Sequence, residues 1–394
     1  MSHLPQARMK STTIIILLLL LLLLHINPAS STALPLPTCR DTNNNENDTP
    51  SHLQARQPTA AISLNPTQKN EQFVLQELWT RHLRWNKLSR QMKAKVYWGR
   101  VSVLALLITG GIFQTIATQT TMMHENVYKM VGSAAISTVP LINKHFTNKD
   151  MVRNWTHARA ISERIKGQVI RFQAAVPPYD QSDFEAVKRL VNEVTEIAED
   201  TVEVDMTLAY ARTTLKRNEN EPLPVKMDTN RELYIEHRLQ PQIDKYLADA
   251  KRLSTKVEYL KKIEGVLIAA SAAIGPLSLV TGLGQTYAMT MKKLSAWPSV
   301  VNSCGIAIAS HYHACKYEEE AGEWSHAAYR LKNLRLKLPH DAEPKVGGTQ
   351  EGEWRAFVER CEEAIYETMV DWTVLKNRPE ETKLKDKVTT AKKK

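Results

Sequence analysis

The stretch that decides the fold is Val101–Gln119, which reads VSVLALLITGGIFQTIATQ. No formal charge occurs between Val101 and Met123, and such a run is long enough to cross the hydrocarbon core of a bilayer, which takes roughly 20 residues. Gly110 and Gly111 lie at its middle, where small residues let two helices approach closely. The stretch therefore predicts a transmembrane helix.

A second uncharged stretch follows after a short polar tip. Met130–Asn143, MVGSAAISTVPLIN, is too short to span by itself and contains Pro140. Extending it back over Lys129 gives a full-length segment. The two stretches together predict a membrane hairpin at about residues 101–143, and the alternative is a buried hairpin of a soluble protein.

The same arrangement occurs again near residues 265–310. Gly265–Met291 and Leu294–Ser310 are uncharged, with Lys292 and Lys293 between them. We therefore expect a second hairpin there. Trp297 beside Pro298 suits either a membrane interface, where aromatic rings gather, or ordinary helix packing.

The sequence on either side of the hairpins indicates a duplication. An amphipathic helix precedes each hairpin and a tryptophan-led segment follows it, Asn154-Trp-Thr-His-Ala158 in one case and Glu323-Trp-Ser-His-Ala327 in the other. Apolar residues at three- to four-residue spacing predict helices at about 71–100, 154–172, 183–208, 231–262, 324–338 and 353–376, with a bend at Pro241. The predicted fold is all-α, a membrane protein of two helix–hairpin–helix modules with long amphipathic soluble helices.

Composition changes along the chain give the expected domain boundaries. They are an N-terminal appendage at 1–70, a first module at 71–216, a linker at 217–230, a second module at 231–376 and a charged tail at 377–394. In the appendage, Arg8 and Lys10 precede the apolar run Ile14–Leu24, the layout of a secretory signal or anchor, although a leucine tract without targeting value remains open. The polar residues 38–70 are expected to be disordered.

Charge predicts the orientation and one partner. The chain carries 52 Lys and Arg against 42 Asp and Glu, a net charge of +10, with a mean hydropathy of −0.36, which excludes a transporter made mostly of spans. The segment before the first hairpin holds a cluster of basic residues: Arg81, Arg84, Lys87, Arg90, Lys93, Lys95 and Arg100. Basic residues collect on the cytoplasmic side of membranes, so the soluble helices are predicted to be cytosolic and to meet anionic headgroups rather than nucleic acid.

This orientation conflicts with a working signal at the N-terminus. A signal or anchor at 14–26 would place residues 34–100 outside the cytosol, and the simplest topology does not allow both. The seven basic residues favour the cytosol, so the sequons beginning at Asn47 and Asn154 are predicted to be unglycosylated. The compartment is left open.

Candidate chemistry is sparse. Cys39, Cys304, Cys315 and Cys361 form no CxxC pair, which argues against a zinc ribbon or a disulfide framework. In His311-x-His-x-Cys315 two potential ligands share a helix face, and zinc needs three or four. Gly282-Leu-Gly284 lacks the strand and third glycine of a phosphate-binding turn, and Glu318-Glu-Glu320 is predicted to be a solvated face. We predict no catalytic residue, no metal and no cofactor.

Several spaced residues nevertheless resemble a family. They are Trp79 with the basic helix into Val101, the run from Asn154 and Trp155 through Arg159 and Glu163 to Lys166, the break from Pro177 to Asp180, Tyr234 with Arg238, Gln242, Tyr246 and Ala250, and Phe357 with Glu362, Ile365 and Trp372. This tandem arrangement, over roughly residues 70–376, resembles the SLATT domains, two-transmembrane effector modules found with SMODS nucleotidyltransferases and SLOG sensors. The resemblance implies a membrane-embedded helical effector that oligomerises and permeabilises membranes.

We therefore expect a non-enzymatic integral membrane protein that self-associates as a pore or stress effector. The alternative is a membrane-anchored scaffold that binds protein partners, whose identity is open, without conducting. The expected helix-packing residues in the membrane are Gly110, Gly111, Ala270, Ala273 and Gly275. The expected polar lining residues are Gln114, Thr118, Ser271, Thr281 and Gln285.

Overall fold

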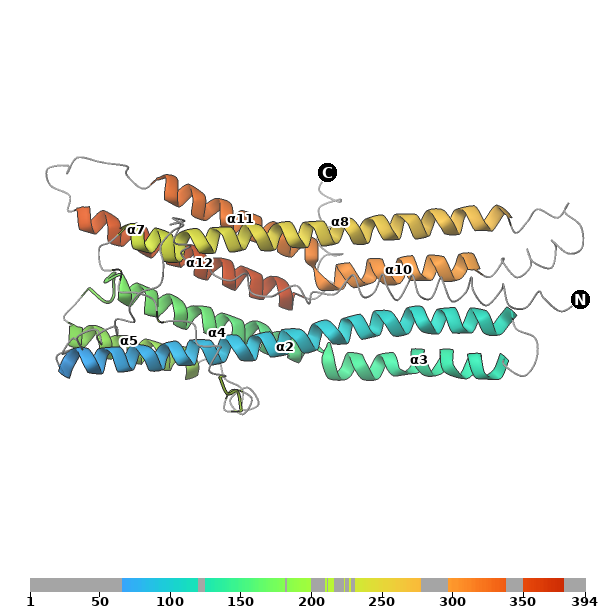
Figure 1. Ribbon diagram of the computed structural model, residues 1–394, viewed down its shortest axis with the longest axis horizontal. Helices are drawn as coiled ribbons and strands as arrows, with labels where there is room; N and C mark the ends of the chain where they lie inside the picture. Colours follow the sequence, from blue (N-terminus) through green and yellow to red (C-terminus); the bar gives the residue numbers. More distant parts are fainter. Residues whose placement is uncertain are drawn as a thin grey trace, which may run out of the picture. The chain divides into compact units, whose positions relative to one another are not determined.

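The computed structural model describes six stretches, 66–119, 125–180, 183–199, 231–277, 297–337 and 350–378, and a few residues between 210 and 227. All of them belong to one compact unit, Pro66–Lys394. Within these stretches the structure is helical and contains no strand (Figure 1). The predicted all-α class is confirmed. The leucine tract at 14–26, the lining candidates Thr281 and Gln285 and most of the linker at 217–230 lie outside the described residues.

The first half of the unit is built on one very long helix. α2 runs from Pro66 to Gln119, 54 residues, so the amphipathic segment and the uncharged segment form a single continuous helix. α3 (Glu125–Phe146) returns along its C-terminal part, while α4 (Lys149–Gln173) packs on its N-terminal part, and α5 (Asp183–Glu199) packs on α4 (Figure 1).

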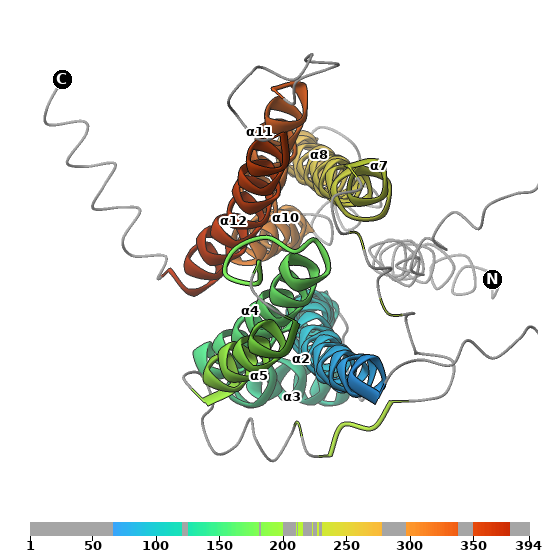
Figure 2. The ribbon, with the colours of Figure 1, turned by 90° about the vertical axis from the view of Figure 1, so that its left-hand side faces the viewer.

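The second half repeats this order. After a short helix α7 (Arg231–Tyr234) and a π-helical turn η2 (Ile235–Leu239), α8 runs from Gln240 to Leu277. α10 (Trp297–Cys315) and α11 (Tyr317–Leu336) both pack on α8, as α3 and α4 pack on α2 (Figure 2). α12 (Gln350–Asn377) packs on α11, as α5 packs on α4. The two halves thus have the same sequence of helices and the same neighbours.

Four helices begin at different residues from those predicted, and the first is α2, which begins at Pro66 rather than Glu71. α4 begins at Lys149 rather than Asn154, because the Asn148 side chain caps it by accepting a hydrogen bond from the Met151 N–H at 2.8 Å. α11 begins at Tyr317 rather than Trp324, directly after Lys316, which has a left-handed backbone. α12 begins at Gln350, three residues before Glu353.

The bend predicted at Pro241 takes the form of a π-turn. Pro241 has no N–H, and its ring would clash with the His237 carbonyl in a regular helix. The chain widens there instead, and the Gln240 N–H bonds to the Ile235 carbonyl, five residues back. This turn carries Arg238 and Leu239 into the protein interior, where both are buried.

The two halves meet through α12, which packs on α4, and through α10, which packs on α2. At the centre, Trp372 of α12 meets Trp155 edge-on at a ring-centroid distance of 5.4 Å and stacks on Trp324 at 6.0 Å. Trp324 in turn stacks on Tyr246 of α8 at 5.1 Å. All four rings are buried. The two tryptophans that the repeated motifs share therefore pack on the same third tryptophan.

The prediction of two membrane hairpins is only partly supported by the length and apolar character of the helices. Among the described residues, one helix, Glu71–Gln119, is long and apolar enough to cross a bilayer. Of the most apolar 18 residues of this helix, 33% are buried by protein. α3 is not apolar enough over such a length, and the residues between α8 and α10 lie outside the described part. A membrane hairpin in each half is therefore not confirmed.

Trp372 is the residue whose loss should most weaken the contact between the halves. Truncating it to alanine removes two ring contacts and the hydrogen bond that its Nε1–H donates to Glu320 at 3.0 Å. We expect Trp372→Ala to lower the free energy of unfolding by about 3–5 kcal/mol, measured by denaturant unfolding of the detergent-solubilised full chain with helical circular dichroism. Tyr329→Ala, at a 66% exposed position on α11, is the control and should change it by less than about 0.5 kcal/mol. Equal effects would contradict the packing argument.

Candidate functional site

The first hairpin is held together by a close approach of two glycines. A β-carbon on Gly110 would lie 2.6 Å from Cγ1 of Ile136 and 3.2 Å from the Gly132 carbonyl oxygen, and one on Gly132 would lie 3.0 Å from Cγ of Gln114. Only glycine fits at such distances, so α2 and α3 are in backbone contact there. Phe113 also stacks on Tyr128, with ring centroids 6.0 Å apart. Sequence reasoning missed Gly132, although its place in an uncharged run was a usable signal.

Gly111 lies on another face of α2. A β-carbon there would meet nothing within 4 Å. Of the two glycines predicted to pack helices in the membrane, Gly110 thus packs inside the chain and Gly111 faces open space. In α8, Ala270 is half-buried and Ala273 is exposed, and Gly275 lies near the end of the described helix.

The hairpins leave many apolar side chains uncovered. In the first hairpin the exposed ones are Leu107, Val127, Met130, Val131, Ile136 and Leu141, and in the second they are Val266, Ile268 and Ile306. Met130 is 66% exposed and Val266 is 68% exposed, whereas the soluble part of α2 buries Leu75, Leu78 and Leu83. An apolar surface of this kind on uncharged helices marks a face made for an apolar solvent or another protein.

The described residues among those predicted to line a water path lie on α2 and α8. Gln114 and Thr118 are exposed on α2, and the Thr118 hydroxyl donates to the Thr115 carbonyl at 2.8 Å. The Ser271 hydroxyl donates to the Pro298 carbonyl at 2.9 Å, which ties α8 to α10 inside the second hairpin. Within one chain the Thr118 and Ser271 hydroxyls thus bond to helix carbonyls.

The seven basic residues before Val101 are spread along α2. Because the helix is continuous, Arg81 lies about 30 Å along the axis from Val101, and salt screens exposed charges beyond about 8 Å. Arg81 pairs with Glu77 at 3.5 Å, and Lys87 Nζ donates to the Thr214 carbonyl at 2.8 Å. The seven are therefore spread over about 30 Å of helix, with Lys95 and Arg100 nearest to Val101, and their contact with a membrane stays a prediction.

The second hairpin joins the soluble helices through a reciprocal pair of lysines. The chain turns at Lys316 (φ 54°), between α10 and α11. Lys316 Nζ donates to the Leu375 and Arg378 carbonyls at the end of α12, at 2.8 and 2.6 Å. Lys376 Nζ donates to the Cys315 carbonyl at the end of α10, at 2.9 Å, and to Glu320 at 2.7 Å. Each lysine thus caps the other helix, where a cation also suits the helix dipole.

Glu320 corrects the prediction of a solvated acidic face. Its side chain is buried and accepts hydrogen bonds from Trp372 Nε1 and Lys376 Nζ, because this position on α11 faces α12. Burial alone would raise the pKa of Glu320, but Lys376 and Lys93 hold that pKa below its ordinary value. Glu318, two residues earlier, is exposed as predicted.

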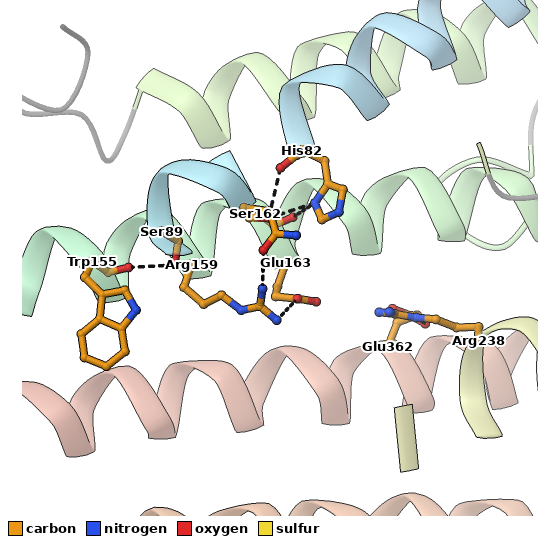
Figure 3. A network of polar contacts seen from close by, with 9 residues as sticks. His82, Ser89, Trp155, Arg159, Ser162, Glu163, Arg238 and Glu362 are labelled. Carbon is orange, nitrogen blue, oxygen red and sulfur yellow. Dashed lines mark hydrogen bonds and ion pairs between the residues drawn. The ribbon is translucent and has the colours of Figure 1, made fainter. Parts of the chain in front are cut away.

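A bidentate ion pair lies in the core of the second half. Arg238 Nε and Nη2 donate to the two carboxylate oxygens of Glu362 at 2.9 and 2.8 Å (Figure 3). The Tyr234 hydroxyl donates to Oε1 of the same carboxylate at 2.9 Å. Burial would lower the pKa of Arg238, but Glu362 raises that pKa above its ordinary value, so the guanidinium stays charged. Removing one partner of such a pair is strongly destabilising, because the other charge is left buried.

A second polar cluster links α2 and α4. Arg159 forms an ion pair with Glu163 and donates to Asn86 Oδ1 at 2.8 Å, while His82 Nδ1 lies 2.8 Å from the Ser162 carbonyl oxygen (Figure 3). Burial would raise the pKa of Glu163, but Arg159 and Lys245 hold it well below the ordinary value. Ser162 and His82 resemble a nucleophile–base pair, but they are 0% and 1% exposed, so no substrate can reach them. Their role is packing.

No metal-binding group of three His, Cys, Asp or Glu side chains occurs in the stretches that the structure describes. His311 and Cys315 lie on one face as predicted, with Nε2 and Sγ 3.8 Å apart, and His313 is exposed. The glycine motif at 282–284 lies outside those stretches.

Two family models match separate parts of the chain. Residues 234–372 match the family model described as SMODS and SLOG-associating 2TM effector domain 1, so the second half of the chain is similar to SLATT domains. Residues 84–186 match a different model, described as a protein of unknown function (DUF4231). No curated protein and no solved structure gives a match.

The SLATT match runs from Tyr234 to Trp372. It includes the buried pair of Arg238 and Glu362 and one of the two reciprocal lysines, Lys316, while Lys376 lies four residues beyond it. Its two hairpin helices are α8 and α10. The predicted resemblance is confirmed, with the SLATT match confined to the second module and a DUF4231 match in the first.

Gly110 and Gly111 separate packing within the chain from packing between chains. Gly110→Leu should push α3 away from α2 and lower the unfolding free energy by about 1–3 kcal/mol, because no space exists beside Ile136. Gly111→Leu, at an open position, should leave that free energy unchanged. Thermal unfolding of both variants in detergent is the measurement, and comparable losses would argue against the observed helix contact.

His82 should make the stability depend on pH. Burial, with a smaller contribution from Lys166, lowers the pKa of His82 from 6.5 to about 3. The unfolded chain therefore takes up a proton before the folded one, and stability falls as the pH drops below 6.5. We expect a loss of about 2 kcal/mol between pH 7 and pH 5 that His82→Gln abolishes and His326→Gln, at an exposed position, retains. Denaturant titrations at the two pH values measure it.

Proposed function

We propose that both hairpins cross a membrane and that the chain self-associates there as a helical effector that opens a water-filled path. The observation that carries the proposal is the uncovered apolar surface of the hairpins, from Leu107 and Met130 in the first to Val266 and Ile306 in the second. In water that surface would have to be covered by another protein, whereas in hydrocarbon it needs no cover.

Helix lengths support the proposal. The uncharged part of α2, Val101–Gln119, is about 28 Å long and the 22 residues of α3 are about 33 Å, close to the roughly 30 Å hydrocarbon core. In each half one helix of the hairpin, α2 in the first and α8 in the second, is continuous with the helical arm that is proposed to lie outside the membrane. The other breaks beyond the uncharged stretch, at Thr147 and Lys316. The family description, a two-transmembrane effector domain, supports the same assignment for α8 and α10.

Charge supports a cytosolic position for the soluble arms. Arg100 precedes the first hairpin and Lys144, Lys149 and Arg153 follow it, while the start of α3 adds no net charge, because Glu125 and Lys129 form an ion pair 2.5 Å apart. Anionic headgroups on the cytosolic leaflet are the matching partner. The mechanism needs no catalytic residue and no cofactor, and nucleic acid has no part in it.

A scaffold remains the second candidate, because the soluble helices also expose apolar residues. Phe184 on α5 is 70% exposed and Leu336 on α11 is 77% exposed, and either could dock a partner protein. In that case the hairpins would anchor the chain without conducting.

Membrane insertion and permeation are tested with one matched pair of variants. The purified chain should release an anionic dye from vesicles of neutral and acidic phospholipid, and in cells it should stay with carbonate-stripped membranes. Leu107→Arg places a charge in the hydrocarbon, at about 2.5–3.5 kcal/mol per chain, and should reduce both readouts. Leu336→Arg changes an exposed leucine on a soluble helix and should reduce neither. Retention without release would favour the scaffold, and recovery in the supernatant would refute both.

A further inference from the structure

Helix α3 presents three different faces, and each suits a different environment. The face toward α2 is made of residues at alternating spacings of four and three: Tyr128, Gly132, Ala135, Val139 and Ile142. Gly132 is buried, the other four are half-buried, and Ile136, 37% exposed at the edge of this stripe, packs against Gly110, so this is the face that α2 covers. About two thirds of the circumference of α3 has no cover from the described part of the chain.

One uncovered face is apolar. It carries Val127, Met130, Val131 and Leu141, which are 50%, 66%, 37% and 59% exposed. Ala134 and Thr138 lie on the same face, and the Thr138 hydroxyl donates to the Ala134 carbonyl at 2.7 Å, which removes its need for water. At 100° per residue these six positions fall within one third of the helix circumference. This face suits lipid.

The remaining face is polar along its whole length. It consists of Asn126, Lys129, Ser133, Ser137, Pro140 and Lys144, all exposed. Pro140 has no N–H to donate to the Ile136 carbonyl, which adds an acceptor in the middle of the helix. No residue of this face is a large apolar one, so α3 is amphipathic inside a hairpin whose other helix is apolar.

The depth of Lys129 makes this face costly in lipid. Tyr128 stacks on Phe113, which lies six residues, or about 9 Å along the helix axis, before the end of α2 at Gln119. Lys129, the next residue after Tyr128, therefore lies at about the same depth. A charged side chain within hydrocarbon costs about 2.5–3.5 kcal/mol, and its ion pair with Glu125 does not remove the need for hydration. Water on this side of α3 removes that cost, and in a bilayer only other protein can enclose that water.

We propose that α3 is the lining helix of the water path, with its polar face toward the water, α2 behind it and the Met130–Leu141 face toward lipid. The enclosing protein is further copies of the same chain. This inference rests on the proposed membrane function and replaces α2, with Gln114 and Thr118, as the lining element. Lys129 and Lys144 against one carboxylate, Glu125, give the path an excess of positive charge, so it favours small inorganic anions.

The faces of α3 are tested by thiol accessibility. Single cysteines are placed on the polar face (Ser133→Cys, Ser137→Cys) and, as matched controls, on the apolar face (Met130→Cys, Leu141→Cys). The full-length protein is reconstituted in vesicles of neutral and acidic phospholipid and exposed to a small, charged, water-soluble maleimide. The parent chain is the blank, since its described cysteines, Cys304, Cys315 and Cys361, are buried. We expect labelling at Ser133 and Ser137 at least about tenfold faster than at Met130 and Leu141.

The outcomes separate this inference from the proposed function. Equal labelling of both faces, labelling of the apolar face, or no labelling of either overturns it. Labelling of Gln114→Cys and Thr118→Cys instead, in protein that releases dye, leaves the pore in place and rejects α3 as its lining. Labelling confined to the polar face in protein that never releases dye supports the inference and rejects open conduction.

Selectivity gives an independent readout. In planar bilayers with a potassium chloride gradient, the reversal potential of the parent should correspond to a preference for chloride. Lys129→Ala leaves the Glu125 carboxylate without its partner and should lower the chloride-to-potassium permeability ratio at least about threefold. Lys337→Ala, at an exposed position beyond the end of α11, is the charge-matched control and should not change the ratio. An unchanged ratio in Lys129→Ala would contradict a lining role for α3.

Discussion

The contact of Trp372 with Trp155 and Trp324 is the interaction on which the arrangement of the two halves depends. Each half is a hairpin attached to a helical arm, and the halves meet where α10 packs on α2 and where α12 packs on α4. At the second contact the shared tryptophan fixes how the arms meet, because one ring on α12 packs against one ring from each repeat. Buried aromatic rings of this size contribute more than most core residues, so the position of α12 on α4 is set there.

Much of the helical architecture could be predicted from the sequence. The apolar spacing of α2, α5 and α12 and the repeated tryptophan motifs indicated helices and their order, because packing on one face leaves a 3.6-residue period. The starts of α4 and α11 were missed, since they depend on the Asn148 cap and the left-handed Lys316 rather than on periodicity. The contact between Gly110 and Gly132 pairs residues 22 positions apart, and periodicity within one helix carries no information about it.

The candidate site was predictable in character but not in detail. Uncharged stretches indicated the hairpins, whereas the burial of Glu320 and the spread of the basic residues along α2 required the positions of neighbouring helices. The buried pair of Arg238 and Glu362 joins residues 124 positions apart, and a sequence without relatives offers no signal for such a pairing. The faces of α3 also required the structure. Its polar and apolar faces could be recognised only once α2 was known to cover its third face.

The reciprocal caps of Lys316 and Lys376 have a thermodynamic consequence. Because each lysine holds the last carbonyls of the other's helix, the end of α10 and the end of α12 cannot fray independently. Whatever displaces the end of α12 therefore lowers the cost of unwinding the end of α10, and a change that loosens α10 weakens the packing of α12 by the same factor. Two ammonium groups thereby make the ends of the two helices parts of one linked equilibrium.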